Sequence, residues 1–366
     1  MQARALHSTL GADNTLRLTI DEVELGEPGP DEVIVRVDAA PVNPTDIFLM
    51  LSMADLSRAT MRDGALEAPV PPPVTQVFAG RIDQRLPLGT EGAGTVIAAG
   101  ASGQALVGKR VGASGGMFAS HRKLPLAAVR ELPAGCTAEQ GASWFVNPMT
   151  ALSFLETMRA EKHTAIVHTA AASNLGQMLV KICAADKVPL VNIVRRKEQV
   201  DQLRAIGAEH VLDSSTPTFG QQLVDAIAAT GATLAFDAIG GGTLGSQILD
   251  AMERVARRSM KVFSHYGSAT HKQLYIYGSL DRSPVTVTRT FGLSWGIGGY
   301  LVMNALRKLG PEAMARMSAR VMSELTTTFA SHYHARISLD QLLDVETLRA
   351  CAATTTGQKY LIVGSK

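Results

Sequence analysis

From about Ser143 onwards the chain alternates short apolar stretches with amphipathic segments, and this alternation constrains the fold more than any other feature. An apolar stretch at 163–170 is followed by apolar residues at helical spacing in 175–187, and the same order repeats further along. Strands joined by crossover helices run parallel, with helices on both faces of the sheet. The sequence therefore predicts a doubly wound parallel sheet, with strands at 163–170, 188–194, 209–213, 232–241 and 272–280.

The part of the chain before this alternation is β-rich. Residues 31–40 alternate apolar and polar side chains, and 90–100 and 108–114 add short strands that glycine punctuates. The proline-rich stretch 67–78 cannot form a central strand, so we expect a loop there. The last strand, 356–364, is expected to rejoin this β-rich part.

Length and charge narrow the class of protein. At 366 residues the chain is long enough for two domains, and its net charge of +2 without a Lys/Arg-rich run disfavours nucleic acid and membrane surfaces as partners. Cys136, Cys183 and Cys351 lie far apart, which excludes a cysteine zinc lobe and fits a reducing, cytoplasmic location. The N-terminus lacks a signal pattern, and the apolar stretch 291–306 is too short to span a bilayer.

The loop 168–176 connects the first predicted strand of the sheet to its helix. A dinucleotide-binding turn needs small residues for the tight turn, for close backbone approach and for helix packing, and Ala171, Ser173 and Gly176 meet these needs. A pyrophosphate could then bind at the helix N-terminus. The loop alone leaves open whether it binds a cofactor or is a packing seam of small residues.

Arg195 and Arg196 follow the second strand, where an NAD site would have Asp or Glu. Two guanidinium groups suit the 2′-phosphate of NADPH, since arginine forms charge-assisted bonds to phosphate. The alternative is a solvated basic turn. The loop and this pair together predict NADPH as cofactor.

The chain resembles the zinc-free medium-chain dehydrogenase/reductases, in the branch of quinone oxidoreductases and 2-enoyl reductases. The resemblance is carried by residues 41–46, 89–94, 147–151, 168–176, 204–213 and 354–364. It implies an α/β protein with a GroES-like, β-rich catalytic domain (1–142 and 300–366) and an inserted Rossmann domain (143–299). Residues 258–270 look like an addition before the fifth strand.

The resemblance also implies that the protein works without metal. Zinc-dependent relatives carry Cys where Asn43 stands and His where Thr90 stands. An amide and a hydroxyl are poor zinc ligands beside a thiolate and an imidazole.

By resemblance, Asn43 and Thr150 should lie at the nicotinamide, and they are the candidate catalytic residues. The other expected cofactor contacts are Ala172, Ser173, Asn174 and Leu175 at the pyrophosphate, Arg195 and Arg196 at the 2′-phosphate, and Ile239, Tyr277 and Gly278 along the cofactor. Three of these have a structural alternative: Asn43 as a turn residue, Thr150 as a helix-start hydroxyl and Tyr277 as a core aromatic.

The substrate side lacks one expected group. Relatives that reduce 2-enoyl thioesters carry a tyrosine shortly after the segment equivalent to 41–46, and none stands there in this chain. Phe48, Met50 and Trp295 suit a flat hydrophobic acceptor, or else pack in the core. We therefore expect hydride transfer from NADPH to a quinone, whose oxygens solvent can protonate. The alternatives are reduction of activated C=C bonds and a non-catalytic NADPH-binding protein.

The sequence also predicts a homodimer. Residues 283–291 are rich in β-formers, and family members pair this edge across a two-fold axis. Val285 and Val287 would then lie in a sheet shared by two subunits, with 291–306 packed nearby. An unpaired apolar edge would otherwise invite aggregation.

Overall fold

The computed structural model describes residues 1–353 and 357–364. It falls into two compact units, one formed by 1–146 with 322–366 and the other by 147–321. We call them unit 1 and unit 2 and describe each by itself. Among the described residues, no helix combines the length and the apolar character that crossing a bilayer requires.

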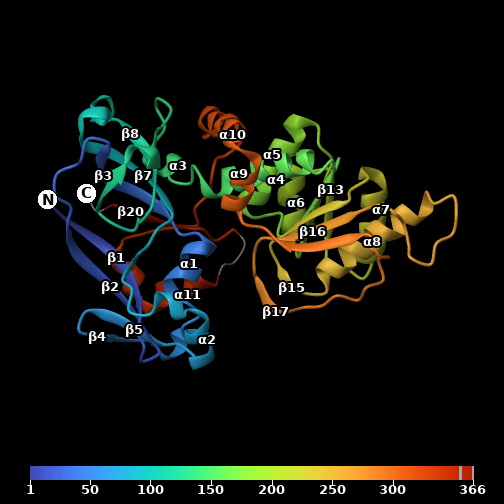
Figure 1. Ribbon diagram of the computed structural model, residues 1–366, viewed down its shortest axis with the longest axis horizontal. Helices are drawn as coiled ribbons and strands as arrows, with labels where there is room; N and C mark the ends of the chain where they lie inside the picture. Colours follow the sequence, from blue (N-terminus) through green and yellow to red (C-terminus); the bar gives the residue numbers. More distant parts are fainter. Residues whose placement is uncertain (354–356, 365–366) are drawn as a thin grey trace. The chain divides into compact units, whose positions relative to one another are not determined.

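Unit 1 is built on two mostly antiparallel sheets (Figure 1). The first has the order β4-β5-β2-β1-β6, with β4 Thr60–Arg62, β5 Ala65–Pro69, β2 Thr15–Glu24, β1 Gln2–Leu10 and β6 Leu86–Pro87. The second has the order β10-β8-β7-β3-β20-β19, with β10 Val129–Glu131, β8 Arg110–Ser114, β7 Glu91–Ala99, β3 Glu32–Pro41, β20 Tyr360–Val363 and β19 Ala335–Ile337, and β9 His121–Pro125 pairs with β3. The C-terminal strand β20 pairs with β3 (Ile362 opposite Ala40), which confirms that the end of the chain rejoins the β-rich part.

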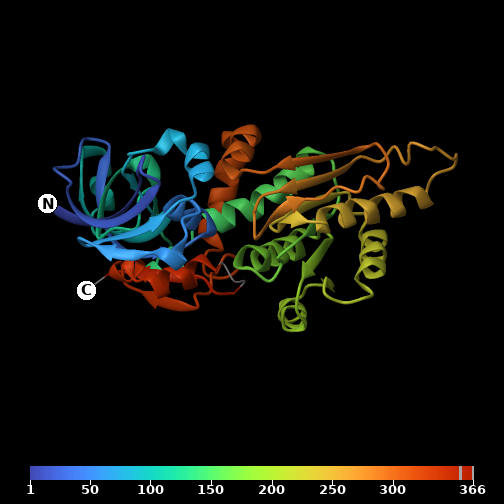
Figure 2. The ribbon, with the colours of Figure 1, turned by 90° about the horizontal axis from the view of Figure 1, so that it is seen from below.

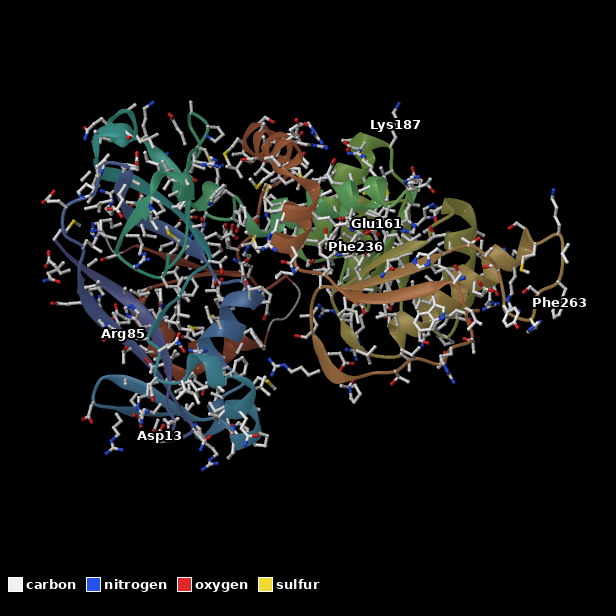
Figure 3. All side chains as sticks on the ribbon, viewed as in Figure 1. Asp13, Arg85, Glu161, Lys187, Phe236 and Phe263 are labelled. Carbon is white, nitrogen blue, oxygen red and sulfur yellow. The ribbon has the colours of Figure 1, made fainter. Side chains whose placement is uncertain are left out.

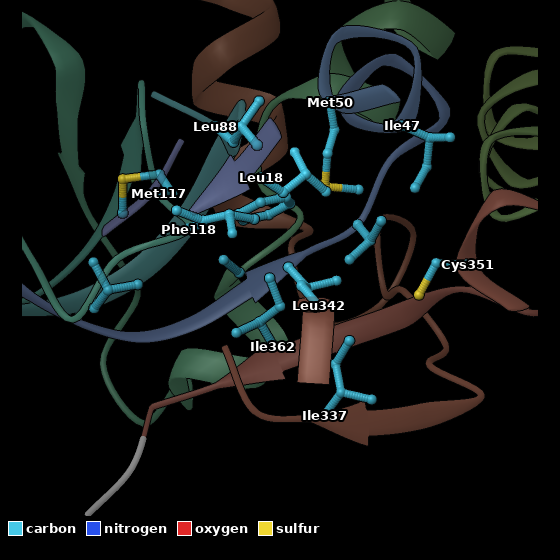
Figure 4. Packing of buried hydrophobic residues seen from close by; sticks show 14 of the residues in the cluster. Leu18, Ile47, Met50, Leu88, Met117, Phe118, Ile337, Leu342, Cys351 and Ile362 are labelled. Atoms are coloured by element: carbon cyan, nitrogen blue, oxygen red, sulfur yellow. The ribbon is translucent and has the colours of Figure 1, made fainter. Parts of the chain in front are cut away.

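A large apolar core fills much of unit 1. Leu18, Met50 and Phe118 are fully buried in it, beside Ile337 and Ile362 from the C-terminal segment (Figure 4). The helices of this unit are α1 Pro44–Leu51, α2 Pro72–Val77, α3 Ala138–Gly141 and α11 Val345–Ala352, and the short 3-10 turns are Leu56–Arg58, Ala79–Arg81, Ala101–Leu106, Leu126–Ala128 and Asp340–Leu343. The prediction of a loop throughout 67–78 was wrong in two places: residues 67–69 belong to β5, which lies between β4 and β2, and residues 72–77 form α2. Proline fits the first turn of a helix, where its missing N–H has no partner to lose.

Unit 2 holds a six-stranded parallel sheet of order β13-β12-β11-β14-β16-β18, which confirms the predicted parallel sheet. Its strands are β13 His210–Asp213, β12 Leu190–Val194, β11 Ile166–His168, β14 Leu234–Asp237, β16 Lys272–Ile276 and β18 Trp295–Gly299. The sixth strand, β18, was not predicted, because its glycines and apolar residues lie inside the uncharged stretch 291–306 and show no alternation.

Helices cover both faces of this sheet. Ala235 packs into one core cluster with α7 and α8, whereas its neighbour Phe236 points to the other face and stacks on Phe154 of α4 at 3.9 Å between ring centroids. Figures 1 and 2 show the helices around the strands, and Figure 3 labels Phe236. The helices are α4 Val146–Ala160, α5 Asn174–Asp186, α6 Lys197–Ala205, α7 Phe219–Thr230, α8 Leu244–Arg258, α9 Val302–Leu309 and α10 Pro311–Ser323, and β15 Gly240–Gly242 pairs with β17 Asp281–Val285.

Helices α9 and α10 belong to unit 2, although the sequence analysis grouped residues from 300 onwards with the β-rich part. Two ion pairs tie α10 to α4 and α5: Arg316 to Glu156 at 3.4 Å, and Arg320 to Asp186 at 2.9 Å. The second boundary between the structural units therefore lies at 321/322.

Candidate active site

The loop between β11 and α5 is shaped by its small residues. The Ser173 hydroxyl caps α5 and accepts the backbone N–H of Gly176 at 3.2 Å. A Cβ on Gly176 would lie 2.1 Å from the carbonyl oxygen of Ala171, so only glycine fits this position. Because the first N–H groups of a helix have no intrahelical acceptor, the start of α5 can receive an anion. Ala172 and Leu175 have buried side chains and can offer only their backbone.

The carboxyl ends of β11 and β14 are locked together beside this loop. Thr169 donates its hydroxyl to Asp237 at 2.6 Å and accepts the backbone N–H of Ala238 at 2.8 Å. Asp237 also accepts the N–H groups of Ile239 and Gly240, at 2.9 and 3.1 Å. This network fixes the turn that carries Ile239, one of the expected cofactor contacts.

The side chain of Tyr277 is engaged inside the unit. Its hydroxyl lies 2.7 Å from Nε2 of His168. Burial lowers the pKa of His168 to about 3, so the imidazole is neutral near pH 7, and burial raises the pKa of Tyr277. At the next residue, Gly278, a Cβ would lie 2.5 Å from the carbonyl oxygen of Ala238. Tyr277 thus has the environment of a core aromatic with a bonded hydroxyl, and the backbone after it passes close to the end of β14.

Arg195 and Arg196 are exposed directly after β12, the strand that pairs with β11. The backbone N–H of Arg195 donates to Gln199 Oε1 at 3.1 Å, which fixes the turn into α6. Within residues 1–353 and 357–364, neither guanidinium group makes a side-chain hydrogen bond or an ion pair. By contrast, the neighbouring Lys197 is held by Asp201 at 3.0 Å. The two arginines are therefore available to an anion.

Unit 1 contains a buried polar cluster around Asn43. The Asn43 side chain is 1% exposed, and its amide donates to Glu91 Oε1 at 3.0 Å. Its backbone N–H donates to Asp46 at 2.9 Å, and Asp46 also accepts the hydroxyl of Thr90 at 2.6 Å. In the described part of the chain, the Oδ1 atom of Asn43 has no hydrogen-bond donor. Asn43 is thus a helix N-cap with one buried acceptor left over.

Two buried carboxylates and one lysine set the charge of this cluster. Glu91 accepts the backbone N–H groups of Phe145 and Val146 at 2.9 and 3.0 Å. Burial raises the pKa of Glu91 and of Asp46, whereas the positive charge of Lys359 opposes both shifts. Burial in turn lowers the pKa of Lys359, against the attraction of the two carboxylates.

Lys359 belongs to a hydrogen-bonded network with Ser143 and Tyr333, which the sequence analysis did not predict. Its ammonium group donates to Ser143 Oγ at 2.8 Å, and the hydroxyl of Tyr333 donates to the same oxygen at 3.0 Å. Burial raises the pKa of Tyr333. No local pattern of residues predicts this hydrogen-bonded network, because its three members lie up to 216 residues apart.

Comparisons with known proteins agree with this architecture. Residues 29–134 match the model of the alcohol dehydrogenase GroES-like domain. A mitochondrial enoyl-[acyl-carrier-protein] reductase of Arabidopsis thaliana is 24% identical over 290 residues, which cover 76% of this chain and 65% of that protein. The solved structure of a putative NADPH:quinone reductase from Mesorhizobium loti has a TM-score of 0.73 at 23% identity and covers 99% of this chain and 98% of that one.

The chain therefore has the fold of the medium-chain dehydrogenase/reductases, with a GroES-like β-rich domain and a parallel sheet. The structure of the Etr1p complex with NADP and crotonyl-CoA is a further neighbour, with a TM-score of 0.70 at 20% identity over 99% of this chain and all of that one. The chain spans less than two thirds of the length of these curated relatives: 65% of the Arabidopsis protein and 52% of the mouse mitochondrial enoyl-[acyl-carrier-protein] reductase, to which it is 27% identical.

The medium-chain fold often houses zinc, and this chain offers poor ligands where zinc-dependent relatives bind it. The side-chain amide of Asn43 donates to Glu91, and the hydroxyl of Thr90 donates to Asp46. Over the ranges that the structure describes, no group of three or more His, Cys, Asp or Glu side chains could hold a metal ion. Independence from metal stays a prediction.

The residues expected at the substrate or nicotinamide have unequal environments. Phe48 is 52% exposed on α1 beside Phe78. Met50 is fully buried in the unit 1 core, which agrees with the alternative that it packs in the core. Trp295 is the first residue of β18 and pairs with Lys272, the first residue of β16. It therefore lies at the amino ends of the strands, whereas Gly278 follows the carboxyl end of β16, so Trp295 is not part of the proposed pocket. Thr150 is buried in the second turn of α4.

Proposed function

We propose that this medium-chain protein is an NADPH-dependent oxidoreductase that transfers hydride to a quinone. The observation that carries the cofactor assignment is the pairing of a glycine-tight turn after β11 with two unpaired arginines after β12. A neighbour of the same fold is named an NADPH:quinone reductase, which supports the choice.

The residues fit the parts of NADPH. The backbone from Ala172 to Leu175, with Ser173 and Asn174, would hold the pyrophosphate at the start of α5. Arg195 and Arg196 would bind the 2′-phosphate. Ile239 and the backbone at Tyr277 and Gly278 would lie along the cofactor.

At the other end of the cofactor, Asn43 and Thr150 would position the nicotinamide. The buried Oδ1 of Asn43 can accept a bond from a carboxamide, a group with N–H donors. Bound NADPH would supply the hydride, and the protein would supply orientation and exclusion of water.

The cofactor assignment is tested by replacing both arginines, R195A/R196A. A hydrogen bond to a charged group contributes about 1.5–3 kcal/mol, so we expect the KM for NADPH to rise on the order of 10²–10³-fold, towards the lower figure because both side chains are exposed. The KM for NADH should hardly change. Arg204, exposed in the last turn of α6, is the matched control, and R204A should alter neither value. Equal weakening of NADH and NADPH in the double variant would make the arginines structural.

The acceptor is tested by following NADPH oxidation with quinones, enones and enoyl thioesters. Turnover with quinones supports the proposal, and turnover with enoyl thioesters alone rejects it. Cofactor binding without turnover on any acceptor would favour a non-catalytic protein.

Reduction of an activated C=C bond is the second candidate, and one specific observation favours it. The product carbon needs a proton, and the chain of Tyr333, Ser143 and Lys359 contains two groups that can donate one. Relatives named enoyl reductases agree with this candidate.

The variant Y333F separates the two candidates. If Tyr333 protonates the substrate, kcat for enones or enoyl thioesters should fall about 10²-fold or more while quinone reduction is unchanged. Tyr360, whose hydroxyl has no hydrogen-bond partner in the described part of the chain, serves as control through Y360F. Equal rates of Y333F and the parent with every acceptor would remove this tyrosine from the chemistry.

A further inference from the structure

The segment 259–271, which joins α8 to β16, carries an exposed apolar tip. Val262 is 78% exposed, Phe263 85% and Tyr266 60%. Leu293 is 71% exposed, and its backbone N–H donates to the carbonyl of Tyr266 at 3.0 Å, so it extends the same patch. Figure 3 shows Phe263 at the outer end of this loop, pointing away from the sheet of unit 2.

The base of the loop is firmly held, so the exposure of the tip is built into the fold. Ser268 donates its backbone N–H and its hydroxyl to Glu253, at 2.8 and 2.6 Å. Glu253 is in turn paired with Lys272 at 2.6 Å, and both side chains are buried. A Cβ on Gly267 would lie 2.7 Å from the Cα of Gly292, which shows how closely the two backbones pack.

The surroundings of the tip are basic. No Asp or Glu occurs from Arg254 to Leu280. Arg254, Arg258 and Lys261 are exposed, and none of them forms an ion pair within the described residues, whereas Arg257 is taken by Glu253. The three free cations therefore flank an apolar surface with no counter-charge of its own.

We propose that this tip docks the protein reversibly on an anionic lipid surface. Aromatic and aliphatic side chains beside Lys and Arg are the combination that enters the interface of a charged bilayer. A protruding tip suits a yielding surface, whereas a protein partner would need an apolar pocket with an acidic rim. Each basic residue near such a surface is worth about a five-fold gain in binding, so three give on the order of 10²-fold.

This inference departs from the sequence analysis, which disfavoured membrane surfaces as partners because it found no Lys/Arg-rich run. The basic residues are interspersed with Val255, Ala256, Ser259 and Met260, and only the end of α8 and the turn after it bring them together. The contact is peripheral and goes beyond the proposed enzymatic function.

The test measures co-sedimentation of the full chain with vesicles of phosphatidylcholine alone, and with vesicles that also contain phosphatidylglycerol. We expect at least ten-fold tighter binding to the anionic vesicles, and weaker binding as salt is added. The variant V262S/F263S should lose most of the binding, and R258E/K261E should lose the preference for anionic lipid. V77S removes a side chain that is 80% exposed on α2 and should bind like the parent.

Far-ultraviolet circular dichroism and thermal unfolding show whether each variant is folded. Equal binding to both kinds of vesicle, or binding that neither tip variant changes, overturns the proposal. So does a change of oligomeric state in V262S/F263S without vesicles, because the patch would then be covered by a second copy of the chain.

Discussion

Replacing Glu253 by glutamine should destabilise unit 2 strongly, because this carboxylate is the only counter-charge described for a buried lysine. Lys272 is 0% exposed and Glu253 1%, with Nζ and Oε2 2.6 Å apart. Arg257 and Ser268 add further hydrogen bonds to the same carboxylate. Glutamine keeps the size of the side chain, so E253Q removes the charge with little change in packing.

The magnitude can be worked out in two ways. Breaking a buried ion pair by removing one partner costs about 3–5 kcal/mol. Burial opposes ionisation of Glu253, but bonds from Lys272, Ser268 and Arg257 outweigh it and lower its pKa to about 2, from 4.5. At about 1.4 kcal/mol per pKa unit, the carboxylate contributes about 3 kcal/mol. The two routes agree.

The sign of the pH dependence follows from the lowered pKa. A carboxyl group whose pKa is lower in the folded state stabilises the fold above its ordinary pKa. This stabilisation is present above pH 4.5 and is lost as the pH falls from 4.5 to about 2. The difference in unfolding free energy between the parent and E253Q should therefore be largest near neutral pH and shrink in acid.

The assay is urea unfolding followed by tryptophan fluorescence between pH 7 and pH 3. The chain has two tryptophans, Trp144 in unit 1 and Trp295 in unit 2, so a W144F background reports on unit 2 alone. Asp201, paired with Lys197 at the surface, gives the control D201N, which should cost under about 0.5 kcal/mol. A loss below about 1 kcal/mol in E253Q, or a difference that does not change with pH, would refute the reasoning.

Two predictions concern the cofactor turn and the assembly. G176L should raise the Kd for both NADPH and NADH, because the side chain would meet the carbonyl of Ala171, and isothermal titration of each cofactor measures this change; undiminished binding would count against the turn. All of β17 Asp281–Val285 is exposed, so sedimentation velocity at micromolar concentration should show a dimer that V285K/V287K dissociates, whereas a stable parent monomer would reject that edge as an interface.

The parallel sheet could be predicted because its order is local. Each strand is a short apolar run, and each helix has its own periodicity, so the repeated units at 163–280 point to one topology. The strand β18 escaped prediction because glycines at 296, 298 and 299 remove the side chains that would alternate. Its place is set by pairing with β16, a tertiary contact that no window of sequence contains.

The candidate site divides in the same way. Gly176, Arg195 and Arg196 could be found because a strand–turn–helix motif fixes their spacing along the chain. Met50 and Trp295 were chosen for chemical type alone. Whether such a residue can reach a substrate depends on its burial in a core and on its position along a strand, and residue type alone predicts neither.

The cluster around Glu91 shows what two buried carboxylates require of their surroundings. Glu91 and Asp46 lie beside the amide of Asn43 and the hydroxyl of Thr90, and buried carboxylates need a positive charge or hydrogen-bond donors nearby. Lys359, just before β20, supplies the positive charge, and its electrostatic influence reaches both carboxylates. Because β20 pairs with β3, which leads directly to Asn43, the C-terminal strand holds the lysine in register with the cluster. K359M should therefore raise the pKa of Glu91 and of Asp46, whether or not Lys359 contacts a substrate.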